Sequence, residues 1–280
     1  MRLFLVALLA AAFCHAGGEL LVITGIAAQN EAVSEIGKGL VIVRNLLPVG
    51  ASPETYSPSA RQLAICSQAV AFISMGTPME RALLPKLKAS FPRLKVWDGT
   101  QGMAYRKDED GHAAAHSKGG MDPHLWLSIA NMKIHADTVA RALCDALPAE
   151  TARINANLAD YLKRLDELQG QVSQILAPLK GRTVIVFHPA FGYLLDSVGL
   201  RQLAVEQHGR DASARHLAEL KDKAAKLECR LVFVQPQSNP ISAAKAAEIL
   251  QRKTRVLSPI PENYSPGMLE MARTLRSAFE

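Results

Sequence analysis

The sequence has little of what marks several large protein classes. Cysteine is scarce, with four among 280 residues and none in a Cys-x-x-Cys spacing. Aromatic residues make up only 5%, and the basic residues are scattered among acidic ones without a long basic run, so nucleic-acid binding is not expected. The sequence contains no His-Glu-x-x-His pair, so the helical zinc-hydrolase signature is absent.

Residues 1–16 have the composition of a secretory signal. An early arginine is followed by an apolar run and by small residues up to Ala16, and the run is too short to span a bilayer. Phe13 stands where a lipobox needs a small residue, which disfavours a lipid anchor at Cys14. We therefore expect an exported, periplasmic protein. Its three remaining cysteines, Cys66, Cys144 and Cys229, are adjacent to apolar residues and are expected to be buried thiols.

The rest of the chain alternates apolar runs with amphipathic segments. The runs at 19–25, 69–74 and 182–187 do not alternate with polar residues, which is typical of parallel strands covered on both faces. From 149 to 176 the apolar positions recur at threes and fours, which predicts one helix about 40 Å long. The pattern predicts an α/β fold of two lobes with mainly parallel sheets. We expect an N-terminal lobe over 17–147, a long linking helix over 148–180 and a C-terminal lobe over 181–280.

Two histidines occur where the chain turns. His124 lies in Asp-Pro-His-Leu-Trp, where Pro123 fixes its own φ and so holds the following imidazole at a defined angle. It is either a metal ligand or a residue that caps or packs at a helix entry. His188 follows a buried strand directly, and carboxyl ends of parallel strands build binding sites, so we prefer the ligand interpretation to that of a core histidine.

Three further residues are candidates on weaker patterns. Glu54 lies in a loop rich in proline, glycine and serine after a predicted strand, where a carboxylate faces either the crevice or solvent. His112 and His116 lie in a charged segment without an apolar pattern, and they either collect metal as auxiliary ligands or are solvated.

Three motifs carry a resemblance to a known family: GASPETY (50–56), MDPHLWL (121–127) and FHPAFGYL (187–194). On these, the chain resembles the zinc- and manganese-binding periplasmic solute-binding proteins of bacterial ABC transporters, the ZnuA- or TroA-like proteins. The resemblance implies two α/β lobes joined by a long helix, with one transition-metal ion in the cleft between them. It implies that His124 and His188 are ligands. Glu54 falls where the family usually has its first histidine.

The fourth ligand departs from the family pattern. The family often has an aspartate in a late loop, and that position falls at Ser258, a poor metal ligand. Glu262, four residues after Ser258, replaces the family's aspartate as a ligand if the loop shifts. Gln235 occupies a position at which some relatives carry a glutamate. The resemblance therefore implies a metal site of Glu54, His124, His188 and Glu262, with Gln235, Ser258, a loop histidine or water as alternatives to the last.

The function that the resemblance implies is metal capture without catalysis. The chain would act as a monomer that binds a divalent metal and delivers it to an ABC permease. A mixed nitrogen and oxygen ligand set suits Zn²⁺ first, with Mn²⁺ or Fe²⁺ as alternatives. Because ligation needs neutral imidazoles, binding is expected to weaken as the pH falls through about 6.5. Two other classes stay open: a metallohydrolase with an open position for water, and a metal-independent binding or adhesion protein.

Overall fold

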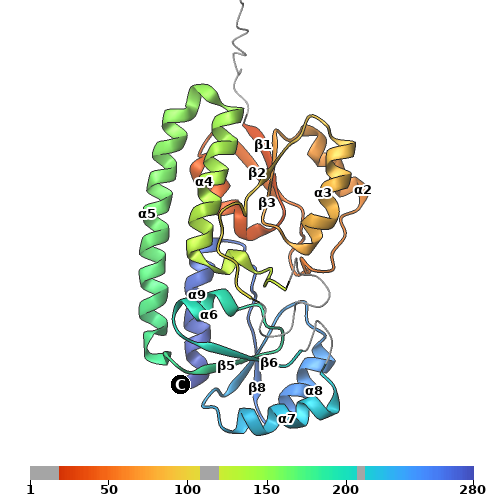
Figure 1. The fold of residues 1–280 in the computed structure, drawn as a ribbon, viewed down its shortest axis with the longest axis vertical. Coiled ribbons are helices and arrows are strands. Elements are labelled where there is room, and N and C mark those ends of the chain that lie inside the picture. The colour runs from red at the N-terminus through yellow and green to blue at the C-terminus, as the bar shows by residue number, and fades with distance from the viewer. Residues whose placement is uncertain (1–18, 108–119, 207–211) are drawn as a thin grey trace, which may run out of the picture.

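The computed structural model describes residues 19–107, 120–206 and 212–280. The predicted signal at 1–16 and the two loop histidines, His112 and His116, lie outside these described residues. Two four-stranded parallel sheets lie one beyond the other along the molecule, and a layer of long helices runs beside both (Figure 1). The predicted two-lobe α/β fold is confirmed.

The first sheet has the strand order β2-β1-β3-β4. Its strands are β1 (Leu20–Thr24), β2 (Val41–Asn45), β3 (Ala71–Ser74) and β4 (Lys95–Asp98), and the helices of this part of the chain are α1 (Asn30–Ile36), α2 (Ala60–Leu63), α3 (Pro78–Ser90) and α4 (Ile129–Ala146). Every residue of β3 is buried, whereas edge strands β2 and β4 have exposed positions. The inner strand β3 is therefore covered on both faces, whereas the edge strands are partly open to solvent.

The second sheet repeats this arrangement with the order β6-β5-β7-β8. Its strands are β5 (Thr183–Val186), β6 (Arg201–Ala204), β7 (Leu231–Val234) and β8 (Lys253–Val256), and its helices are α6 (Gly192–Ser197), α7 (Ala214–Ala225) and α8 (Pro240–Leu250). In each sheet the first strand of the chain lies inside, with the second on one side and the third on the other. Helix α6 was not predicted, because six residues are too few to show a helical period.

Two helices connect the lobes. Helix α5 (Thr151–Leu176) has 26 residues, about 39 Å at 1.5 Å per residue, and runs beside both sheets (Figure 1). The last helix, α9 (Tyr264–Arg276), packs against α5 and also against α1. The backbone N–H of Ser265 on α9 donates to Oε2 of Glu31 on α1 at 2.8 Å. The C-terminal helix thus contacts the first lobe, and the predicted domain boundaries stay predictions.

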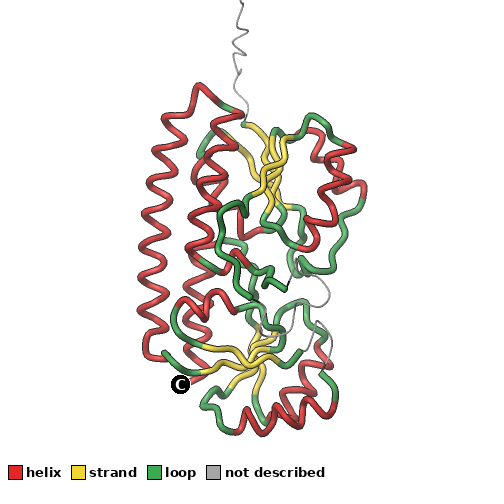
Figure 2. The backbone as a smooth tube through the Cα atoms, viewed as in Figure 1, coloured by secondary structure: helices red, strands yellow, loops and turns green. Residues whose placement is uncertain are grey.

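The loops between the two sheets are the part of the fold that positions the site (Figure 2). Cys66, Cys144 and Cys229 are free thiols, of which Cys66 and Cys229 are buried as predicted and Cys144 is half-buried. Among the helices in the described ranges, none is both long and apolar enough to cross a membrane.

Candidate metal site

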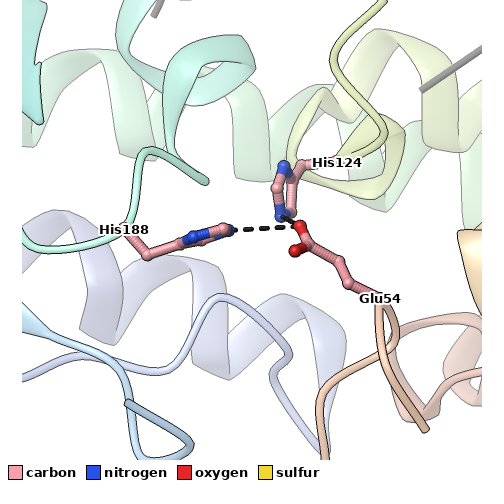
Figure 3. A group of neighbouring side chains, drawn as sticks. All are labelled: Glu54, His124 and His188. Carbon is pink, nitrogen blue, oxygen red and sulfur yellow. Dashed lines mark ion pairs between the residues drawn. The ribbon is translucent and has the colours of Figure 1, made fainter. Parts of the chain in front are cut away.

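Three of the predicted ligands converge between the lobes. Glu54, His124 and His188 each offer a donor atom, and these atoms lie within 4.8 Å of one another. Figure 3 shows the three side chains pointing toward a common centre from three different loops. Oε1 of Glu54 is 3.5 Å from Nε2 of His124 and 3.2 Å from Nε2 of His188. Donors of a tetrahedral zinc site with bonds of about 2.05 Å are about 3.3 Å apart, so the two separations from Oε1 of Glu54 suit one such ion.

The orientation of His124 is set by its own motif. The carboxylate of Asp122 accepts the backbone N–H of His124 at 2.9 Å and also lies 2.8 Å from Nδ1 of the ring. Both residues are almost completely buried. Because a carboxylate is an acceptor, Nδ1 carries the proton and Nε2 is directed to the site as a potential ligand. The ring also packs edge-on against Trp126, with centroids 5.2 Å apart.

Asp122 is in turn held by residues of both lobes. The guanidinium of Arg106 lies 3.4 Å from Asp122 and 2.6 Å from Asp196 of α6 in the second lobe. The hydroxyl of Tyr193, also on α6, donates to the backbone carbonyl of Asp122 at 3.0 Å. In addition, the indole N–H of Trp126 donates to the carbonyl of Pro259 at 2.7 Å. These contacts fix the motif that carries His124 against the second lobe.

His188 has a carboxylate partner of its own. Its Nδ1 lies 2.7 Å from Oε2 of Glu206, which follows β6, the neighbour of the strand that precedes His188. Burial disfavours the charged imidazole, but hydrogen bonds to Glu206 and Glu54 and the charges of both carboxylates outweigh burial and raise the pKa of His188 to about 10. A metal ion would replace the proton on Nε2. The loss of binding that was expected near pH 6.5 therefore moves to higher pH.

Glu54 lies in the loop between β2 and α2. Its backbone N–H donates to Oγ of Ser52 at 3.2 Å, and the carbonyl of neighbouring Pro53 accepts the N–H of Met79 on α3 at 2.9 Å. The loop is thereby attached to the first lobe, and the side chain of Glu54 is 14% exposed. The side chain of His188 is about as exposed, at 11%, whereas that of His124 is only 3% exposed.

The site opens into a cavity of about 180 Å³ that Glu206 and Gln235 also line. The structure does not bring the fourth predicted ligand to it: Glu262 is exposed and, with Ser258, lines a separate cleft of about 680 Å³. The hydroxyl of Ser258 bonds to Ile260, and the carbonyl of Pro259 accepts the indole N–H of Trp126, so in the structure this loop holds Glu262 at the separate cleft. This arrangement does not support ligation by Glu262, which stays a prediction.

Sequence reasoning missed Asp122, Arg106 and Glu206 as supporting residues. For Asp122 a signal existed, because an aspartate two residues before a histidine is well placed to accept that residue's backbone N–H. Arg106 contacts Asp122 and Asp196 of α6, and Glu206 contacts His188 because β6 lies beside β5, and the order of segments along the chain does not give either arrangement.

Comparison with known proteins places these observations in a family. The family described as ZnuA, zinc-uptake complex component A, periplasmic, matches residues 22–278. A solved ZnuA structure has 32% sequence identity and a TM-score of 0.87, covering 94% of this chain and 100% of its own. A ZnuA deletion mutant with zinc bound has 31% identity and a TM-score of 0.85, covering 93% and 98%.

Among curated relatives, the zinc-binding protein AdcA of Streptococcus pyogenes is 27% identical over 251 residues, which are 81% of this chain and 48% of AdcA. The chain thus spans about half the length of that relative.

Proposed function

This chain belongs to the ZnuA family of zinc-uptake components, and from that premise we propose that it captures zinc outside the cytoplasm, as a monomer, and delivers the ion to an ABC permease. The convergence of Glu54, His124 and His188 carries the proposal. Donor spacings of 3.2 and 3.5 Å are those of atoms that share one small ion. The carboxylate behind each imidazole supports the same assignment, because metal-bound histidines usually donate their other N–H to such a group.

Zinc is the proposed cargo because two imidazoles and a carboxylate form a common zinc ligand set. Manganese or iron is a second candidate, and Glu54 is the observation that favours it. The resemblance places a histidine at this position in most of the family. A carboxylate oxygen is a harder ligand than an imidazole nitrogen, and Mn²⁺ prefers harder ligands. Neither a metallohydrolase nor a metal-independent adhesion protein is favoured by the family match.

Capture would involve little hinge motion. The contacts of Asp122 and Trp126 with α6 and Pro259 tie the His124 motif to the lobe that carries His188. Glu54 lies in a loop attached to the first lobe, whereas the His124 motif, which leads into α4 of the first lobe, contacts both lobes. We therefore propose that the ion draws the Glu54 loop onto a fixed pair of histidines, and that the permease recognises the surface formed in this way.

The test is metal uptake by chelator-stripped protein offered equal Zn²⁺ and Mn²⁺, measured by elemental analysis and by melting temperature. We expect one equivalent of zinc. At a hundred times Kd the bound ion adds about 2.7 kcal/mol to the free energy of unfolding, which raises the melting temperature by about 5 °C or more.

The His124→Ala, His188→Ala double variant should lose both responses, whereas His216→Ala on α7 should keep them. Unchanged metal affinity in the double variant would overturn the proposal.

A further inference from the structure

The carboxyl edge of the second sheet forms a row of three polar residues. Strand β5 pairs with β6 on one side and with β7 on the other, and Val186 is level with Phe233 of β7. Val186 is likewise level with Ala204 of β6. Two residues further along all three strands, the same register places His188 between Glu206 and Gln235. Neighbouring strands are about 4.8 Å apart, so the two flanking side chains start close to the imidazole. Glu206 already bonds to Nδ1 of His188, which leaves the role of Gln235 to be explained.

Gln235 is buried without the hydrogen bonds that a buried amide needs. The residue lines the same cavity as Glu54, His124 and His188 and is only 5% exposed. In the part of the chain that the structure describes, its Nε2 has no hydrogen-bond partner. Buried amide groups in proteins are nearly always satisfied, and an exception indicates either a functional role or a missing ligand. Here the residue that carries the unsatisfied group is one of those that line the cavity of the proposed ion site.

A side-chain amide can meet a cation with its carbonyl end. The terminal torsion of glutamine is broad and roughly two-fold, so a half-turn exchanges Nε2 and Oε1 with no change in backbone. A cation in the cavity repels the N–H end and attracts the oxygen. Zinc sites of purely structural type have four ligands, and only three protein donors have been assigned.

We propose that Gln235 completes the site by giving its amide oxygen to the captured ion as the fourth donor. The inference rests on the proposed function, since it assigns a residue to the same site. It also bears on the cargo, because a set of two nitrogen and two oxygen donors discriminates less sharply for zinc over manganese than a histidine-rich set does. The other candidates are engaged elsewhere: Glu206 bonds to His188, and Ser258 and Glu262 line the separate cleft.

The decisive variant is Gln235→Leu, which keeps the bulk of the side chain and removes the oxygen. We expect its zinc affinity, measured by competition with a chromophoric chelator, to fall by about tenfold or more, a loss that even outer partners of metal ligands cause. The melting temperature of the metal-free protein should not fall. The visible spectrum of the Co²⁺-loaded protein should change, because one oxygen donor is lost. The matched control is Gln171→Leu, at an exposed position on α5, which should leave affinity and spectrum unaltered.

Gln235→Glu tests the inference independently of folding in the leucine variant. A carboxylate at this position should bind zinc about tenfold more tightly than the amide, because it adds a negative charge to the same donor position. The inference would be overturned if Gln235→Leu kept the zinc affinity and the cobalt spectrum of the parent. It would also be overturned if Gln235→Glu bound zinc no more tightly than the parent. Zinc uptake by the parent protein separates the proposed function from this inference. If the parent binds no zinc, the proposed function is overturned. If the parent binds one equivalent of zinc and this binding does not depend on Gln235, only this inference is overturned.

Discussion

Replacement of Glu206 by glutamine tests how strongly the carboxylate behind His188 tunes the site. The change keeps the size of the side chain and an acceptor for the N–H at Nδ1, which lies 2.7 Å from Oε2 of Glu206, but removes the negative charge. Loss of such an outer partner typically lowers metal affinity by about 10- to 100-fold, which is about 1.4 to 2.7 kcal/mol of binding free energy.

The charge of Glu206 has a second, opposing effect on uptake. It helps to hold a proton on His188, whose pKa is raised to about 10. In Glu206→Gln that pKa falls, so protons compete less with zinc. Proton competition in the parent is strongest at low pH and fades as the pH approaches the pKa. The affinity lost by the variant should therefore be larger at pH 9 than at pH 7.

The assay is a chelator competition for zinc at both pH values. Glu219→Gln is the matched control, because this glutamate is exposed on α7 and pairs with Arg215 away from the site. Tighter zinc binding by Glu206→Gln than by the parent at pH 9 would refute the supporting role assigned to Glu206, because proton competition at a pKa of about 10 weakens the parent by only about tenfold at that pH. A deficit that is the same at pH 7 and pH 9 would refute the competition between proton and metal at His188.

Three further predictions concern other contacts of the fold. Glu54→His should raise the ratio of zinc to manganese affinity by about tenfold, or 1.4 kcal/mol, and an unchanged ratio in parallel titrations would contradict a selecting role for the carboxylate. Arg106→Ala should lower the free energy of unfolding by about 3 kcal/mol, because it removes a cation beside a buried carboxylate, and Arg106→Lys should recover part of the loss in urea melts. Burial lowers the pKa of His135 from its ordinary 6.5 to about 4, so the unfolded chain takes up the proton first. The stability that His135 contributes is full above pH 6.5 and is lost as the pH falls toward 4, by about 3 kcal/mol at 1.36 kcal/mol per pH unit. His135→Gln should remove this dependence, and an identical pH profile of stability in parent and variant would exclude His135 as its source.

The lobes and the two histidines could be predicted because each depends on short segments of the chain. Strands such as β3 and β5 are buried on both faces, so their apolar runs are continuous and distinct from the helical period of α5. His188 follows β5 within two residues, and strand ends of this kind face a crevice. The edge strands carry weaker patterns because part of their surface meets solvent.

The supporting residues could not be predicted, because they depend on which strands and loops become neighbours. Glu206 and Gln235 flank His188 only since β6 and β7 lie on either side of β5. The position of Glu262 at a separate cleft has a related cause. Its loop is fixed by the hydrogen bond between Trp126 and Pro259, residues 133 positions apart, and no local pattern reveals such a contact.

The contact of α9 with α1 and α5 has a consequence for biogenesis. Tyr264, Met268, Met271 and Leu275 of α9 are buried, and Ser265 bonds to Glu31 near the start of the chain. A nascent chain emerges N-terminus first. Helices α1 and α5 can therefore pack against α9 only after residues 264–276 have been synthesised. Until then apolar surface is open to chaperones, proteases and neighbouring chains. A stop codon that removes only the final helix would therefore damage the half of the protein that was made first.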